Sequence, residues 1–132
     1  MPQFPNFTGA PRQTVTQIST ANTNRDGTGT IGTCFTAGNM GSRIDKIRIS
    51  GTGTTTAGVV RIYIHDGSNA RLLDEVLVTA ITPSTSIAVF EAEISYTDGL
   101  LLPAPGGSTA WSLRASTHNA ETFNVFVQGG DF

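Results

Sequence analysis

The stretch ANTNRDGTGTIGTCFTAGNMGSRIDKIRISGTGTTTAGVVRIYIHDG, from Ala21 to Gly67, decides the fold class of this chain. Its short runs of alternating apolar residues are separated by Asp-Gly, Gly-Asn and Gly-Thr-Gly, a pattern typical of β-strands joined by tight turns. Around residues 59–65 apolar and polar side chains alternate strictly, as on a strand with one buried face. The stretch therefore predicts an all-β domain whose function lies on its outer surface.

The same alternation continues through the rest of the chain. No segment shows helical periodicity over about three turns, the length at which an isolated helix becomes plausible. About eight strands in a chain of 132 residues fit two packed antiparallel sheets. We therefore predict an antiparallel, jelly-roll-like β-sandwich over residues 14–132. Its expected strands are 14–19, 29–35, 43–50, 59–65, 71–78, 87–96, 109–116 and 122–128, with a short extended piece at 100–102.

Three local features refine this scheme. The apolar pattern in 43–50 slips by one residue, which a β-bulge near Asp45 would repair. The sequence Asp66-Gly67-Ser68-Asn69 has the residues of a tight hairpin turn. Residues 116–121 are expected to join a second antiparallel pair, formed by the strands around 111–113 and 123–125.

Residues 1–13, MPQFPNFTGAPRQ, differ from the rest because they hold three prolines. Prolines exclude a helix or a central strand, so we predict an extended N-terminal arm. Phe4 and Phe7 could dock on a neighbouring subunit at a modest ordering cost, because the prolines already restrict the free segment. Alternatively, the two phenylalanines fold back over their own domain.

Composition restricts the partners. The chain carries 8 Lys and Arg against 10 Asp and Glu, with a formal net charge of -2, and the basic residues are scattered. This distribution argues against nucleic acid as the main partner. No apolar run approaches a membrane span, and the N-terminus has no secretion signal, so we expect synthesis and folding in the cytoplasm. Cys34 is the single cysteine, and its apolar neighbours predict a buried, inert thiol.

Metal and phosphate motifs are present only in part. Asn22-x-Asn24-x-Asp26-Gly27 resembles the opening of a calcium loop, but Thr33 stands where the closing acid is needed, so a turn is favoured. The glycine- and threonine-rich segment 51–58 lacks the Lys-Ser/Thr ending of a phosphate loop and leads into a strand. The two histidines are too few for a zinc site. We expect no metal and no cofactor.

Catalytic arrangements are equally incomplete. His65 and Asp66 are adjacent, so in a strand they point to opposite faces and cannot form a relay. Glu91 and Glu93 share one strand face, but glycosidase acids sit on different elements with the sugar between them. A solvated or arginine-paired sheet face is the favoured interpretation of these two glutamates. No nucleophile, base and oxyanion arrangement can be assembled, so we expect no catalytic residues and no enzymatic activity.

Three phrases carry a resemblance: ANTNRDGTG at 21–29, TAG through GSRI at 36–44, and GTTTAGVVR at 53–61. They resemble small structural proteins encoded among the virion genes of tailed bacteriophages. The likeness covers residues 21–93 and, more weakly, 123–131. What it implies is a non-enzymatic β-sandwich in many copies on the particle, most like a head decoration or cement protein.

The resemblance also implies partners and a location. A decoration protein would form a homotrimer, bind the major capsid protein and bridge neighbouring capsid subunits. It would be assembled in the host cytoplasm and lie on the virion surface. Neither nucleic acid nor membrane is an expected partner. Phe4, Phe7 and Arg12 are the expected contacts to capsid or neighbour. The alternative is a trimeric tail-fibre or receptor-binding domain that recognises host surface glycan, with Trp111, Tyr63 or Tyr96 as a stacking platform.

Overall fold

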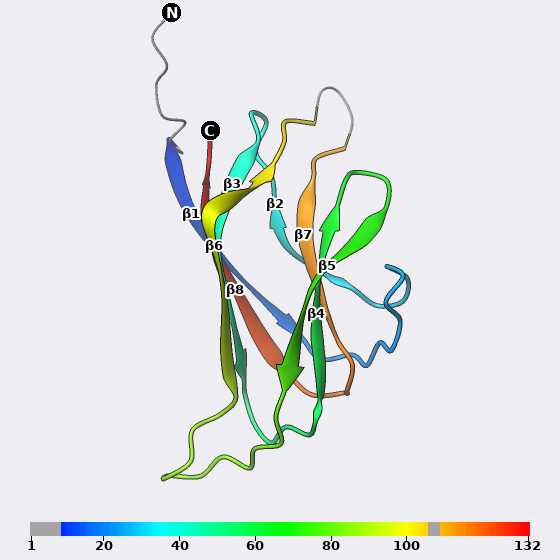
Figure 1. Ribbon diagram of the computed structural model, residues 1–132, viewed down its shortest axis with the longest axis vertical. Helices are drawn as coiled ribbons and strands as arrows, with labels where there is room; N and C mark the ends of the chain where they lie inside the picture. Colours follow the sequence, from blue (N-terminus) through cyan, green and yellow to red (C-terminus); the bar gives the residue numbers. More distant parts are fainter. Residues whose placement is uncertain (1–8, 106–108) are drawn as a thin grey trace, which may run out of the picture.

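The computed structural model describes residues 9–105 and 109–132 and arranges them as two facing sheets of four strands each (Figure 1). No helix occurs in these two ranges. The predicted antiparallel β-sandwich is confirmed. Its strands are β1 (Ala10–Ile18), β2 (Gly32–Thr36), β3 (Ser42–Gly51), β4 (Gly58–His65), β5 (Ala70–Val78), β6 (Glu91–Leu102), β7 (Ser112–Thr117) and β8 (Phe123–Asp131).

The order of the strands is nested. The first sheet has the order β1-β8-β3-β6 and the second sheet the order β2-β7-β4-β5. Antiparallel pairs form between β1 and β8, β2 and β7, β3 and β6, and β4 and β5, from the ends of the chain inward. This is the pattern of a long hairpin rolled up on itself, as in jelly-roll-like sandwiches.

One predicted pairing is wrong. We expected β7 and β8 to form an antiparallel pair through residues 116–121, but β7 pairs with β2 and β4, whereas β8 pairs with β1 and β3. The nested order explains the difference, because every connection except that between β4 and β5 crosses from one sheet to the other. A short polar connection can cross a sandwich as well as close a hairpin, and residue types alone do not separate the two.

The core lies between the sheets and is filled by the inward residues of both. Ile47 and Ile49 of β3 and Val60 of β4 are fully buried. The predicted β-bulge is present: the register of β3 against both neighbours shifts between Ile44 and Lys46, which keeps the isoleucines on the inner side. Phe123 meets Phe90 edge to face, with ring centroids 6.1 Å apart.

The hairpin between β4 and β5 forms as predicted. The Asp66 carboxylate accepts hydrogen bonds from the backbone N–H groups of Ser68 and Asn69, at 2.9 and 2.8 Å. These bonds hold the pKa of Asp66 below its ordinary value. Gly67 has a φ of 94°, in the left-handed region that favours glycine.

Most strand boundaries differ from the prediction by a few residues, and the differences at the starts of β6 and β1 have consequences for the fold. β6 begins at Glu91, later than expected, because residues 84–87 form a turn. In this turn the Ser84 N–H donates to the Ile87 carbonyl at 2.9 Å. At its other end β6 includes the extended piece at 100–102. β1 begins at Ala10, so residues 10–13 of the predicted arm belong to the sandwich. Pro11 is accommodated there because β1 is an edge strand.

Candidate functional site

The outer faces of the two sheets differ in how far other parts of the chain cover them. The outer face of the second sheet lies under the segment of residues 19–31, which we call the covering loop. Arg61 and Tyr63 point outward from β4, since their neighbours Val60 and Ile62 fill the core, yet they are only 1% and 0% exposed. Two side chains that a strand pattern places in solvent are therefore buried by this loop.

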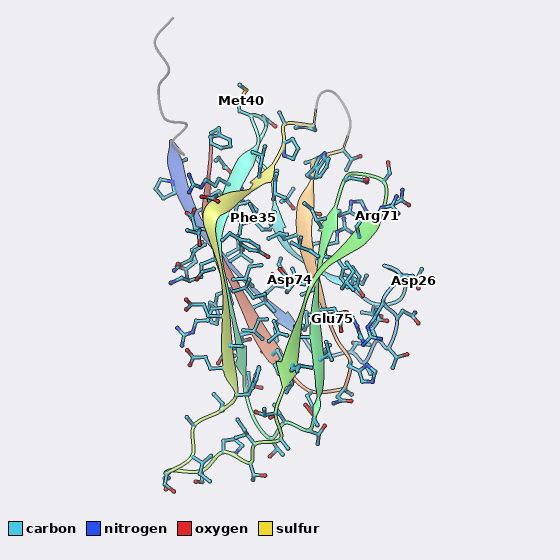
Figure 2. The ribbon with its side chains drawn as sticks, in the orientation of Figure 1. Asp26, Phe35, Met40, Arg71, Asp74 and Glu75 are labelled. Atoms are coloured by element: carbon cyan, nitrogen blue, oxygen red, sulfur yellow. The ribbon has the colours of Figure 1, made fainter. Side chains whose placement is uncertain are left out.

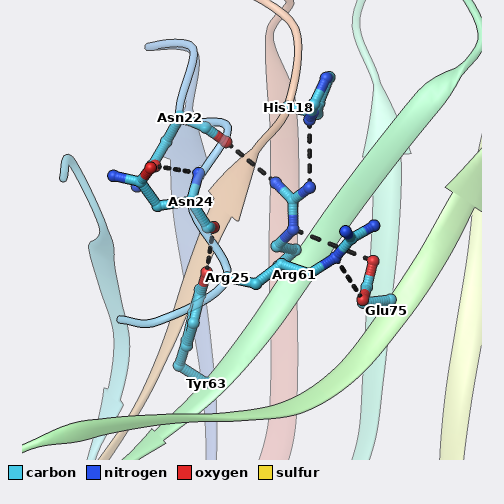
Figure 3. Close-up of polar contacts among 7 residues, drawn as sticks. All are labelled: Asn22, Asn24, Arg25, Arg61, Tyr63, Glu75 and His118. Atoms are coloured by element: carbon cyan, nitrogen blue, oxygen red, sulfur yellow. Dashed lines mark hydrogen bonds and ion pairs between the residues drawn. The ribbon is translucent and has the colours of Figure 1, made fainter. Parts of the chain in front are cut away.

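Arg61 is the centre of a polar cluster (Figure 3). Its Nη1 donates to the backbone carbonyl of Asn22 at 2.9 Å, and its Nη2 lies 3.1 Å from Nδ1 of His118. Its Nε lies 3.9 Å from Glu75 Oε2, and Glu75 also pairs with Arg25 of the covering loop at 2.9 Å. Charge and hydrogen bonds thus tie the loop to β4 and β5.

Asn22 holds the covering loop in shape. Its Nδ2 donates to the carbonyls of Thr28 and Thr30 at 2.9 and 3.0 Å, and its Oδ1 accepts from the Asn24 N–H at 3.0 Å. Tyr63 Oη donates to the Asn24 carbonyl at 2.9 Å. The segment of the calcium-like motif is held in shape by hydrogen bonds of Asn22 and of the Asp26 carboxylate within the loop.

The outer face of the first sheet lacks any such cover among the described residues. We call it the open face, and its side chains come from β1, β8, β3 and β6 in turn. Val15, on the edge strand β1, is 60% exposed and lies beside the half-buried Phe126 of β8. The other outward residues of this face are Gln13, Gln17, Asn124, Gln128, Lys46, Arg48, Ser50, Glu91, Glu93 and Ser95.

Polar pairs run across the open face. Gln17 donates to Asn124 at 3.1 Å, and Gln128 donates to Gln13 at 3.2 Å. On the other half of the face both glutamates are paired with cations. Arg48 lies 3.0 Å from Glu91, as the arginine-paired interpretation predicts, while the partner of Glu93 is Lys46, at 3.4 Å. The charges on this face therefore balance, and many of its polar side chains bond one another.

The residues predicted to contact a partner are divided by the structure. Phe4 and Phe7 lie outside the described residues. Arg12 lies in β1, where its Nη1 pairs with Asp131 at 2.8 Å and donates to the Thr36 carbonyl at 2.9 Å. Its guanidinium also lies 4.1 Å from the ring centroid of Phe35, a cation–π distance. Arg12 thus connects the two sheets within its own chain, and its contact with a partner stays a prediction.

The aromatic residues considered for glycan stacking are engaged in the sandwich. Tyr63 is fully buried, and Tyr96 and Trp111 pack against the core. Tyr96 Oη donates to Asp74 at 2.8 Å, and burial together with this carboxylate raises the pKa of the phenol. Tyr63 therefore offers no ring face to a sugar, whereas Tyr96 and Trp111 are only partly buried.

Two further observations concern chemistry. The thiol of Cys34 is buried as predicted, and desolvation raises its pKa to about 12. Among residues 9–105 and 109–132, no three His, Cys, Asp or Glu side chains are grouped so as to hold a metal ion. The same ranges contain no helix that is long and apolar enough to cross a membrane.

Comparisons with known proteins give one distant likeness. No protein-family model matches the chain, and no curated protein matches it. A solved structure described as the capsid asymmetric unit of cyanophage Pam1 contains a similar chain, with a TM-score of 0.46 and 14% sequence identity. The match covers 100% of this chain and 92% of that one. A TM-score below 0.5 does not establish a shared fold, so the functional argument rests on the residues of this chain.

Proposed function

We propose that the protein is a non-enzymatic structural component of a phage particle, which decorates the capsid and bridges neighbouring capsid subunits as a homotrimer. The open face carries this proposal, because its charges balance and the apolar side chains of Val15 and Phe126 lie side by side on it among polar neighbours. Interfaces between proteins combine an apolar centre with a polar rim in this way. The resemblance of residues 21–61 to phage virion proteins supports the same assignment.

The position of the N-terminal segment adds to the argument. β1 is the edge strand of the first sheet and begins at Ala10, so residues 1–8 precede the open face directly in the chain. Phe4 and Phe7 are the proposed anchors of this segment on the capsid or a neighbouring copy. A docked body raises the effective concentration of such a segment, so two weak contacts add as avidity.

Binding to capsids that lack the protein tests the open face. Val15→Lys places a charge beside Phe126, and we expect binding in a co-sedimentation assay to weaken about tenfold or more, the loss typical of disrupting a hot-spot residue of an interface. Leu77→Lys is the matched control, because Leu77 is also exposed, at 77%, but lies on β5 of the second sheet. Equal binding of the two variants would contradict the assignment of this face.

Deletion of residues 1–8 tests the N-terminal segment. The deletion must stop before residue 9, because the Gly9 N–H donates to the Asp131 carbonyl at 2.8 Å and Arg12 belongs to β1. We expect a folded protein that binds capsids poorly. A full-length variant with Phe4→Ser and Phe7→Ser should reproduce this loss, and unchanged binding by both would remove the segment from the proposal.

The same samples address the tail-fibre alternative. A receptor-binding domain would show saturable binding to host cells or to isolated surface polysaccharide, and little binding to assembled heads. A decoration protein gives the opposite result.

A further inference from the structure

A recess opens on the second sheet between the covering loop and the β4–β5 hairpin, with a volume of about 290 Å³. Gly27 forms part of its wall with a φ of 87°, and a Cβ there would lie 2.5 Å from the Ala70 carbonyl oxygen. The loop backbone therefore rests directly on the start of β5. Figure 2 shows Asp26 of the loop and Arg71 of β5 on this side of the molecule.

The arginines of the described chain fall into two groups. Arg71 and Arg114 have no carboxylate within 4.0 Å among the described residues, and both line this one recess. The other five each have an acidic partner within that distance: Arg12, Arg25, Arg43, Arg48 and Arg61. Arg71 is close enough to Asp66 of the hairpin to lower the pKa of that carboxyl, so Arg114 is the cation of the recess that has no acidic partner among the described residues.

Arg114 has the geometry to hold a carboxylate. Its Nε donates to Ser112 Oγ at 3.1 Å, which fixes the side chain and leaves Nη1 and Nη2 without a hydrogen-bond partner among the described residues. These two nitrogens form the planar fork that binds a carboxylate through two parallel hydrogen bonds. The half-buried position of Arg114 limits competition from water.

His65 adds a further donor to the recess. Its Nδ1 accepts a hydrogen bond from the Gly67 N–H at 3.1 Å, so the proton of the neutral ring is on Nε2. Burial and the nearby Arg114 lower the pKa of His65, which keeps the ring neutral near pH 7. The carboxylate of Asp26, the acid that lines the recess, already accepts hydrogen bonds from the backbone and side chain of Thr28.

We infer that this recess binds a carboxylate side chain of a partner protein, held by the free guanidinium edge of Arg114 with Arg71 and His65 beside it. No Phe, Tyr or Trp lines the recess, which disfavours a sugar acid because sugars stack on aromatic rings. Asp26 on the wall opposes a phosphate dianion more strongly than a carboxylate with one charge. The recess and the open face are on different sheets, so this inference does not depend on the proposed capsid contact.

Titration of the ¹⁵N-labelled protein with N-acetylglutamate N′-methylamide tests the inference by NMR. We expect saturable shifts confined to the recess, and about tenfold weaker binding of the neutral glutamine analogue, since a charge-assisted pair contributes about 1.5 kcal/mol or more. Equal binding of the two probes, shifts elsewhere or no saturation would overturn the inference. Tighter binding of glucuronate or inorganic phosphate would overturn the choice of a protein carboxylate.

Variants locate the site. Arg114→Gln should weaken binding of the glutamate probe about tenfold. Arg71 is exposed on the edge strand β5, so Arg71→Gln does not threaten the fold. This variant should weaken binding to a smaller but measurable extent. Arg48→Gln on the open face is the matched control and should leave binding unchanged. An effect of Arg48→Gln equal to that of Arg114→Gln would reduce the inference to non-specific charge.

Discussion

The outer faces of the two sheets carry similar residues in different environments. Arg48 on β3 and Arg61 on β4 both point away from the core in the middle of a strand, and both face a glutamate on the neighbouring strand. The side chain of Arg48 is 50% exposed, whereas that of Arg61 is 1% exposed under the covering loop. The loop, and not the strand pattern, decides whether an outward polar residue is a surface group or a structural one.

This difference predicts unequal energetic roles. An exposed ion pair contributes little to stability because water and salt screen it. When a buried guanidinium is removed, the groups that it bonded lose their partner. A loop carbonyl that accepted its hydrogen bond is then buried and unsatisfied. The covered face should therefore supply stability, while the open face is free to make contacts with other molecules.

The largest effect is expected from Arg61→Met. This change leaves the Asn22 carbonyl without its donor, and Glu75 keeps only Arg25, so the free energy of unfolding should fall by about 3 kcal/mol. Arg48→Met, its counterpart on the open face, should cost less than about 0.5 kcal/mol. Urea denaturation measures both, and equal losses would show that the two faces do not differ in this way.

A second pair compares amide side chains. Asn22→Ala removes the bonds to Thr28 and Thr30 and should destabilise the protein by about 2 kcal/mol, because two carbonyls lose a donor inside the loop. Asn124→Ala on the open face breaks one exposed bond, with Gln17, and should cost less than about 0.5 kcal/mol. The rate of amide hydrogen exchange across residues 19–31 should rise in the Asn22 variant only. A rise in both variants would contradict the role of Asn22 in holding the covering loop in shape.

The sequence predicted the strands well and the covering loop not at all. Alternation in residues 43–50 and 59–65 reports which side chains face the core, so the core, the bulge near Asp45 and the hairpin at Asp66 could be inferred. Periodicity contains no information on what lies over the outer side of a strand. Burial of Arg61 and Tyr63 depends on a loop that is distant in sequence, and only the combined presence of Asn22 and a turn at Asp26 hinted that this loop is ordered.

The pairing of β7 with β8 failed for a related reason. Local signals identify a turn between Thr117 and Phe123, but the choice between a hairpin and a crossing depends on how all eight strands are ordered. Similarly, nothing in the sequence around Arg114 indicates that its acidic partner is missing, because partners come from other strands. Both the recess and the sheet order are properties of the assembled sandwich.

Acid should weaken the contact between the chain ends. A hydrogen bond from Ser42, followed by the pairing with Arg12, lowers the pKa of Asp131 in the folded protein. Its ionised form therefore stabilises the fold at pH values above its ordinary pKa of 3.8, and this contribution is lost as the pH falls through the lower folded pKa. Asp131→Asn should cost about 1.5 kcal/mol at pH 7, the lower end of the range for a hydrogen bond to a charged group.

The control for this prediction is the pH profile itself. Urea midpoints of the wild type and Asp131→Asn should converge as the pH is lowered from 7 to about 2, because the wild-type carboxyl then becomes neutral as well. A constant difference across this range would contradict an electrostatic origin and would instead indicate a packing effect at Gly38 and Ser42, which lie against the Asp131 side chain.

The smallest effect on stability is expected from Val15→Thr on the open face. Val15 is 60% exposed, and threonine also favours strands, so the free energy of unfolding of the isolated protein should change by less than about 0.5 kcal/mol. In the proposed contact with the capsid this residue would become buried, and the loss of its apolar surface would then have a cost. The variant should therefore match the wild type in thermal unfolding when free, and dissociate from capsids at a lower temperature when bound. A loss of stability in the free protein as large as that of Asn22→Ala would mean that the open face is itself part of the structural core, and the contrast between the two faces would no longer hold.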